Sequence, residues 1–210
     1  MESLSSLLQE KTQPERILHK SGYRHVAGVD EAGRGPLAGP VVASAVVFLQ
    51  DWNHPEIKDS KKLTEKKRGV LYHVIKKNAL AWNWALVEPD EIDRINILQA
   101  SLMAMRRAVE SLNVKPDYII VDGPHSFPTH IPQTPIKKGD AKSLAIAAAS
   151  IMAKVVRDSI MQRHHVLYPQ YNFARNKGYG TREHLRALTV YGYCPIHRKS
   201  FKRVVCDRKS

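Results

Sequence analysis

The sequence predicts an α/β protein in which helices cover a mixed sheet. Segments with strand character come first, and further strands then alternate with segments of helical spacing. Such alternation is typical of layered α/β domains. At 210 residues with 43% apolar content, the chain is long enough for one domain with a sizeable core. We therefore expect a single domain over 1–210.

The first half of the chain carries apolar alternation, glycine–proline turns and one capped helix. Thr64 is a suitable N-cap for the second helix, and Trp82 and Trp84 share one strand face by alternation, which favours packing on the sheet over base stacking. Glycines and prolines between the first two strands predict a tight irregular turn. The expected elements are a peripheral amphipathic helix over 3–20, strands over 25–30 and 41–49, a helix over 64–78 and a strand over 80–87.

The second half contains two helices around one short strand. The last helix is rich in alanine, and its small side chains favour close packing against a sheet. After Tyr168 the chain is less regular and very basic. The expected elements are a helix over 95–112, a strand over 117–121 and a helix over 141–166.

The charge of the chain indicates a polyanionic partner. The formal net charge is +13, and nearly all of the excess lies in residues 137–210. Basic surface of this kind attracts nucleic acid, although an ordinary basic protein is the alternative. The two cysteines form no zinc pattern, the N-terminus shows no leader, and no apolar run is long enough to span a bilayer. We expect a cytoplasmic monomer with no membrane partner.

Acidic residues end strands or begin a helix at three places. Asp30 and Glu31 end the first strand, Asp122 follows the fourth, and Asp140 opens the alanine-rich helix. Singly, each has a structural explanation, since Asp before glycine is turn chemistry and Asp140 is a possible N-cap. Because strand ends and a helix start can meet at one edge of a sheet, we expect the four carboxylates to converge.

Converging carboxylates point to metal chemistry. They repel one another unless a cation compensates them, and hard oxygen ligands favour Mg²⁺ or Mn²⁺. Two such ions about 4 Å apart fit phosphodiester hydrolysis, in which one presents hydroxide and the other stabilises the leaving 3′-oxygen. The 10 histidines show no H-E-x-x-H pattern, and this chemistry needs no histidine, serine or cysteine nucleophile.

Seven segments then supply a family resemblance over about residues 25–201. They are VDEAGRGPLAGPV at 29–41, DSKKL at 59–63, NILQA at 96–100, VDG at 121–123, GDAKS running into AAASI at 139–151, KGYGT with a histidine at 177–184, and HRKSF at 197–201. In this order they resemble type 2 ribonuclease H, ribonuclease HII. Ala32, where the type 3 relative carries serine, and the short segment before the motif favour type 2.

The resemblance implies a ribonuclease H-like mixed five-stranded sheet flanked by helices, with a helical basic C-terminal part. We expect a peripheral N-terminal helix at about 1–20, a core at about 24–167 and the C-terminal extension at about 168–210. The resemblance also implies an endoribonuclease that hydrolyses the RNA strand of RNA–DNA hybrids and incises 5′ to ribonucleotides embedded in duplex DNA, leaving 3′-hydroxyl and 5′-phosphate ends.

The resemblance assigns roles residue by residue. The catalytic, metal-binding carboxylates fall on Asp30, Glu31, Asp122 and Asp140, which would hold Mn²⁺ or Mg²⁺, two ions in the substrate complex. The expected partners are RNA–DNA hybrids and DNA duplexes that contain ribonucleotides.

The loop after Glu31 has the composition of a sugar and phosphate site. Gly33 and Gly35 let backbone groups approach a 2′-hydroxyl, which distinguishes RNA from DNA, and Arg34 can hold a phosphate. In similar proteins the tyrosine that matches Tyr179 packs on the deoxyribose after the ribonucleotide. A tight turn and core packing are the structural alternatives. Lys61 is a further candidate for a phosphate contact, and weaker candidates are Lys142, Lys177 and Arg182.

Two other functions remain open on the sequence. A DNA junction nuclease or integrase-like enzyme on the same fold would cut all-DNA junctions and ignore an embedded ribonucleotide. A non-catalytic nucleic-acid-binding protein would need only the basic last third, and the four acids argue against it.

Overall fold

A mixed five-stranded sheet forms the centre of the molecule in this computed structural model, which describes residues 4–10, 13–57 and 63–204. The strand order is β3-β2-β1-β4-β5; β1, β2 and β3 are antiparallel neighbours, whereas β4 and β5 run parallel to β1. The strands are β1 (Val26–Ala32), β2 (Val41–Val47), β3 (Ala81–Val87), β4 (Tyr118–Asp122) and β5 (Gln133–Ile136).

The parallel register brings acidic residues to one end of the sheet. Val29 of β1 pairs with Val121 of β4, so Asp30 and Asp122 follow at the same level on neighbouring strands. Asp122 pairs in turn with Ile136 of β5, whose next residues lead into the turn that carries Asp140. Three segments far apart in the sequence therefore meet at this edge.

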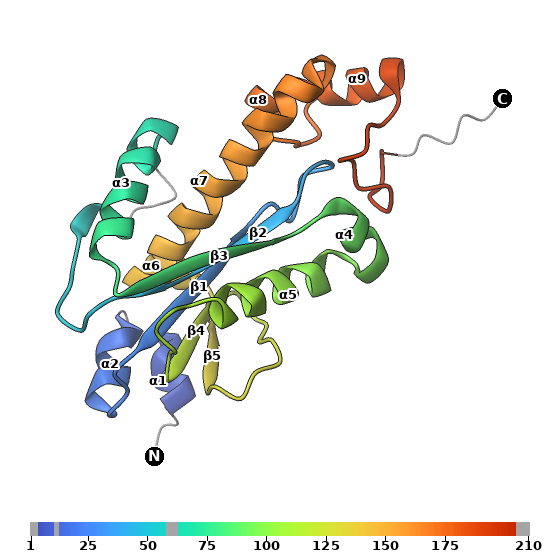
Figure 1. Ribbon diagram of the computed structural model, residues 1–210. Coiled ribbons are helices and arrows are strands. Elements are labelled where there is room, and N and C mark those ends of the chain that lie inside the picture. Colours follow the sequence, from blue (N-terminus) through green and yellow to red (C-terminus); the bar gives the residue numbers. More distant parts are fainter. Residues whose placement is uncertain (1–3, 11–12, 58–62, 205–210) are drawn as a thin grey trace.

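Helices cover both faces of the sheet (Figure 1). The long helix α7 crosses one face beside α3, while α5 lies along the other. The remaining helices are short and lie at the ends of this sandwich. The helices are α1 (Leu4–Glu10), α2 (Pro14–Lys20), α3 (Glu65–Asn78), α4 (Pro89–Ile95), α5 (Ile97–Glu110), α6 (Gly139–Lys142), α7 (Leu144–Leu167), α8 (Phe173–Asn176) and α9 (Arg182–Tyr191), with a 3₁₀ turn at Pro169–Tyr171.

Apolar side chains fill the space between these layers. One cluster lies between the sheet and α5, and another lies between the sheet, α3 and α7. Trp82 and Trp84 pack against these layers, as alternation predicts. A separate cluster joins the loop residues Leu37 and Ala38 to the C-terminal segment. No helix in the described ranges has the length and hydropathy to cross a bilayer.

The predicted mixed five-stranded sheet with flanking helices is confirmed, but the N-terminal helix is wrong in detail. The segment 3–20 contains two short helices, α1 and α2. Gln13, directly before Pro14, adopts a left-handed conformation with φ 65°. Proline disfavours the α conformation in the residue that precedes it, so one continuous helix cannot form.

Other boundaries also differ from the sequence prediction. β1 continues to Ala32, so Asp30 and Glu31 lie within the strand. The alanine-rich helix α7 begins at Leu144 rather than at residue 141, because Ser143 is its N-cap and accepts a hydrogen bond from the Ile146 N–H. Asp140 lies in the separate turn α6 and is not the cap of α7. The residue pattern alone did not predict α4 or the proline-containing edge strand β5.

Candidate active site

The predicted acids gather where β1 and β4 end. Asp30 is buried and Glu31 is half-buried, and both side chains interact electrostatically with Asp122 on the neighbouring strand. The Asp30 Oδ1 accepts a hydrogen bond of 2.7 Å from the Glu31 N–H. Asp122 Oδ1 accepts one of 2.6 Å from the N–H of Gly139, the residue before Asp140. The fourth acid, Asp140, is buried in the adjoining turn.

Burial and repulsion between carboxylates destabilise the ionised forms of Asp30 and Glu31. Burial raises the pKa of Asp30 well above its usual range, and the carboxylates of Glu31 and Asp122 raise it further. Burial also raises the pKa of Glu31, against the lowering effect of Arg34, and Asp122 adds to the rise. A bound cation would remove both penalties, because it favours the ionised form of each carboxyl group.

The donor set fits a hard divalent cation in its chemistry. Its oxygens come from carboxylates, and a positive charge would relieve their repulsion. Among the described residues, however, no three acidic, histidine or cysteine side chains stand in an arrangement that could hold an ion without movement. An ion held by three or more of these side chains therefore requires them to move, whereas one or two carboxylates could hold it together with water or substrate oxygens.

Ser150 is a further residue of the site, to which the sequence pattern assigns no role. This residue of α7 supplies a side-chain hydrogen bond to Asp30, which opposes the rise in the pKa of that carboxyl. Its position in the AAASI segment, on the helix that packs against β1, was the only signal in the sequence.

The loop between β1 and β2 rests on a buried arginine. Arg157 of α7 is 1% exposed, and its Nε, Nη1 and Nη2 donate to the carbonyls of Pro40, Lys177 and Ala38 at 3.0, 2.9 and 3.1 Å. Gly33 has φ +100°, and a Cβ there would lie 2.1 Å from Arg157 Nε. The structure itself therefore requires glycine at position 33.

Gly35 faces the opposite way, into an open pocket. A Cβ at Gly35 would meet only the ring of Tyr179, at 3.6 Å. Tyr179 is 46% exposed, which excludes the core-packing alternative. The pocket has a volume of about 360 Å³, and the acid Glu31, the loop and Tyr179 all line it.

Several basic side chains also line this pocket. Arg34 is exposed and makes an ion pair of 3.4 Å with Glu31, and Arg68 of α3 and Lys154 of α7 also line the pocket. The sequence gives no sign of a role for Arg68 and Lys154, because charged residues on helices are common and these two carry no distinguishing pattern.

The other lysine and arginine candidates are placed differently. Lys61 lies outside the described residues. Lys177 is buried and pairs with Glu65 at 3.6 Å, and the Lys142 Nζ donates to the Gln9 carbonyl. Arg182 is exposed at the start of α9. None of the last three lines the pocket beside Gly35.

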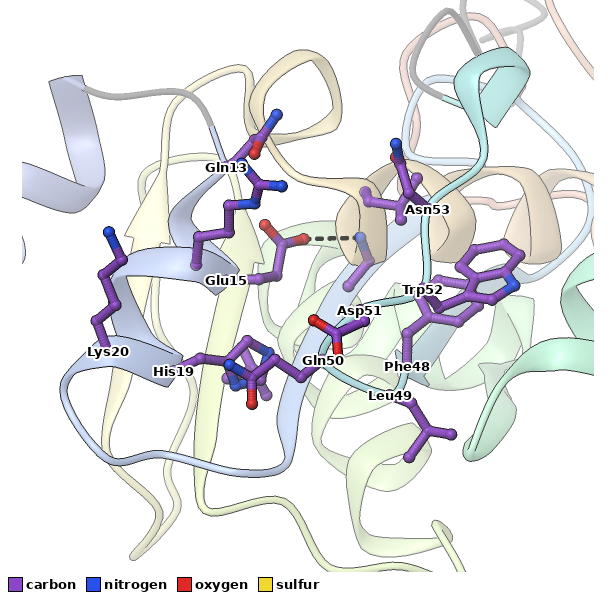
Figure 2. Close-up of a pocket in the computed structure, with 14 residues that line it drawn as sticks. Gln13, Glu15, His19, Lys20, Phe48, Leu49, Gln50, Asp51, Trp52 and Asn53 are labelled. Atoms are coloured by element: carbon purple, nitrogen blue, oxygen red, sulfur yellow. Dashed lines mark hydrogen bonds between the residues drawn. The ribbon is translucent and has the colours of Figure 1, made fainter.

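A further cavity of about 310 Å³ lies at the opposite end of β1 (Figure 2). Its walls include Phe48, Trp52 and side chains of α2. Glu15 reaches from α2 to the start of α7, where it accepts hydrogen bonds from the Ser143 hydroxyl and the Ala145 N–H. The place at which this helix start would attract an anion is thus already filled by a carboxylate. This cavity is separate from the strand-end acids.

The fold, together with acids at adjacent strand ends beside a basic loop, defines a ribonuclease H-like hydrolase. Residues 27–204 match the family model described as Ribonuclease HII. The chain belongs to the ribonuclease HII family and is an endoribonuclease.

Ribonuclease HII proteins of other bacteria match this chain in sequence over most of their length. Ribonuclease HII of Syntrophus aciditrophicus is 56% identical over 188 residues, which cover 90% of this chain and 89% of that protein. Ribonuclease HII of Caldanaerobacter subterraneus is 53% identical, over 92% of this chain and 80% of that protein.

Solved structures share the fold. Ribonuclease H2 from Pyrococcus horikoshii superposes with a TM-score of 0.75 at 29% identity, over 86% of this chain and 95% of that chain. Bst-RNase HIII, solved in complex with Mn²⁺, gives a TM-score of 0.64 at 16% identity, over 89% of this chain and 70% of that chain, which is a likeness of fold.

Proposed function

We propose that this endoribonuclease hydrolyses the RNA strand of RNA–DNA hybrids and incises duplex DNA 5′ to an embedded ribonucleotide, leaving 3′-hydroxyl and 5′-phosphate ends. One observation carries the proposal. Glu31 lines the same pocket as the open Gly35 backbone, so a nucleotide whose sugar contacts the loop would have its phosphodiester beside the acids.

Asp30, Glu31, Asp122 and Asp140 would hold the divalent ions, Mg²⁺ or Mn²⁺. Two bound ions would supply an activated water and stabilise the leaving 3′-oxygen. The raised pKa of Asp30 and Glu31 supports this role, because their ionised forms need a compensating positive charge. Ser150 would keep the Asp30 carboxylate oriented.

Arg34 would leave its ion pair with Glu31 and bind a substrate phosphate instead. Its contact with Glu31 is long, and its side chain is exposed, so the ion pair contributes little to stability. With the charge of Glu31 compensated by a bound cation, the Arg34 guanidinium would be free to bind a phosphate with two parallel hydrogen bonds. Arg68 and Lys154 face the same pocket and would contact neighbouring phosphates, and Lys61 stays a prediction.

Gly35 and Tyr179 would read the sugar. The bare backbone at Gly35 admits a 2′-hydroxyl, which both donates and accepts hydrogen bonds. The exposed ring of Tyr179 lies beside that backbone, where it would pack on the following deoxyribose.

The test is a cleavage map on four substrates with Mg²⁺, Mn²⁺ or EDTA. The substrates are a DNA duplex with one ribonucleotide, a long RNA–DNA hybrid, an all-DNA duplex and an all-DNA four-way junction. We expect one incision 5′ to the ribonucleotide, cuts throughout the hybrid, no cuts in all-DNA substrates and no activity in EDTA. Cutting of the junction without incision at the ribonucleotide would instead support a DNA junction nuclease.

A further inference from the structure

Two adjacent residues after α9, His197 and Arg198, are fully buried although both are polar. They belong to the HRKSF segment, which the acids and the pocket leave unexplained. Burying such side chains is costly unless their hydrogen bonds are satisfied. Their bonding partners therefore show what the segment does.

Arg198 hydrogen-bonds to the backbone of the loop between β1 and β2, called the glycine loop below. Its Nε, Nη1 and Nη2 donate to the carbonyls of Gly39, Arg34 and Gly33 at 2.9, 3.1 and 2.6 Å. Its own N–H donates to the Leu37 carbonyl at 2.9 Å. Burial and the nearby Arg157 lower the pKa of Arg198 to about 9, so the guanidinium remains charged at neutral pH. A planar fork of donors fixes several carbonyls at once, which a lysine cannot do.

His197 reaches the other side of the pocket through a second histidine. The Cys194 N–H donates to His197 Nδ1 at 2.9 Å, so this nitrogen carries no proton and Nε2 is the donor. His197 Nε2 then donates to His184 Nε2 at 2.9 Å, which leaves the proton of His184 on Nδ1. That Nδ1 donates to the Tyr179 carbonyl at 2.9 Å.

The hydrogen bonds of these two histidines all run in one direction, from the Cys194 N–H to the Tyr179 carbonyl, and both rings are neutral. Burial lowers the pKa of His184, and burial together with His184 lowers that of His197 to about 4. Both rings are therefore uncharged near neutral pH, and each nitrogen keeps the role that the network gives it. The far side of the segment is anchored as well, because the N–H groups of Lys199 and Ser200 donate to the Asp93 carboxylate.

We propose that His197 and Arg198 are positioning residues for sugar recognition: Arg198 sets the backbone of residues 33–35, and His197, through His184, sets the backbone at Tyr179. The proposal rests on the proposed function of this pocket. The Tyr179 ring lies beside the Gly35 backbone in one pocket, 3.6 Å from where a Cβ at Gly35 would stand. A nucleotide that contacts both is therefore recognised only if the two backbone segments are in register. Displacements near 1 Å at such a site can cost about a hundredfold in rate.

The first experiment tests the Arg198 arm with the R198K variant. Lysine keeps the charge but satisfies only part of the carbonyl set, so we expect kcat/KM on the one-ribonucleotide duplex to fall at least about tenfold. R107K is the matched control, since Arg107 pairs with Glu91 at the surface, and we expect it to stay within about twofold of wild type. The Mn²⁺ concentration that gives half-maximal activity should be the same in R198K and wild type.

The second experiment tests the His197 arm with two amides. H197Q places an N–H where Nε2 lies and retains the donor to His184, whereas H197N places it near Nδ1 and cannot reach. We expect H197Q to keep kcat/KM within about threefold of wild type and H197N to lose about tenfold. If R198K does not fold, as judged by circular dichroism and thermal melting, this pair decides the proposal.

Double-mutant cycles separate positioning from general loss of stability. We expect R198K to have less than about a twofold effect in a G35A background, and the difference between H197Q and H197N to vanish in a Y179A background. Effects that are the same in every background, or a shifted Mn²⁺ dependence for R198K, would overturn the proposal. If wild type shows no preference for the ribonucleotide, the proposed function itself fails, which is a separate result.

Discussion

The strand-end acids and the glycine loop between β1 and β2 adjoin at Glu31, which lines the same pocket as the loop, but the two regions are held in opposite ways. Asp30 is buried and Glu31 half-buried beside Asp122, and the pKa values of Asp30 and Glu31 are raised. The loop that begins two residues later has its carbonyls bound by the guanidinium groups of Arg157 and Arg198. The ionised forms of Asp30 and Glu31 are therefore destabilised by burial and repulsion, whereas most carbonyls of the loop have hydrogen-bond donors.

This difference assigns the two regions different tasks. A cation that binds among repelling carboxylates stabilises them, so we expect the acidic site to reach its final arrangement only when an ion is bound. A loop with bonded carbonyls needs no ligand to keep its shape, so it can select a sugar by fit. The comparison predicts that chemistry and recognition can be damaged separately.

The largest expected effect is on chemistry. The D30N variant removes one ionisable ligand, and we expect cleavage of the one-ribonucleotide duplex to fall by at least about a thousandfold, since ion-stabilised charge contributes several kcal/mol to such reactions. Binding of the duplex should remain. D51N, the same change at an exposed aspartate, is the control and should cleave normally. Cleavage by D30N at more than a tenth of the wild-type rate would contradict the assignment.

The next effect separates the two glycines. G35A adds a methyl group to the open pocket, so we expect a wild-type melting temperature but a loss of about tenfold to a hundredfold in kcat/KM. G33A places its Cβ against Arg157 at a positive φ, so we expect a loss of about 1–3 kcal/mol in the free energy of unfolding. Thermal melting and steady-state kinetics measure both. Equal losses of stability in G33A and G35A would show that Gly35 does not face an open pocket.

The smallest effect is on the stability of the metal-free protein. The folded chain holds the protons of Asp30 and Glu31 to higher pH than the unfolded chain does, so the free energy of unfolding falls as pH rises through the raised pKa values. We expect D30N in EDTA at neutral pH to melt a few degrees higher than wild type, at about 2–4 °C per kcal/mol.

Lowering the pH below the raised pKa values should narrow this difference in melting temperature, because wild type then regains the protons that relieve the repulsion between its carboxylates. Added Mn²⁺ should reverse the order, since it stabilises the form that carries Asp30. A D30N protein that melts lower than wild type in EDTA would contradict this destabilisation of the ionised acids.

The two regions also differ in how far the sequence predicts them. Asp30 and Asp122 follow apolar strands of evident pattern, so their position at one sheet edge could be predicted from strand direction alone. The separation of Asp140 from α7 was not predicted, because it depends on Ser143 taking the cap.

The residues that support the loop could not be recognised as such from the sequence. Charged residues are rarely buried, so Arg157 in a helix and Arg198 in an irregular basic segment read as surface residues. Their burial becomes possible only when backbone carbonyls from distant segments converge on each guanidinium group, which is a tertiary arrangement. For the same reason, the sequence did not show that Gly33 is also needed for close packing against Arg157, and its contact with a sugar stays a prediction.

The separation of chemistry from recognition is tested most directly by duplex binding in the non-cleaving D30N background. Affinities of D30N and D30N/G35A are measured in Mg²⁺ for a duplex with one ribonucleotide and for the same duplex in all-DNA form. We expect D30N to prefer the ribonucleotide by about tenfold or more and D30N/G35A to lose that preference. An unchanged preference in the double variant, or none in D30N, would contradict the account.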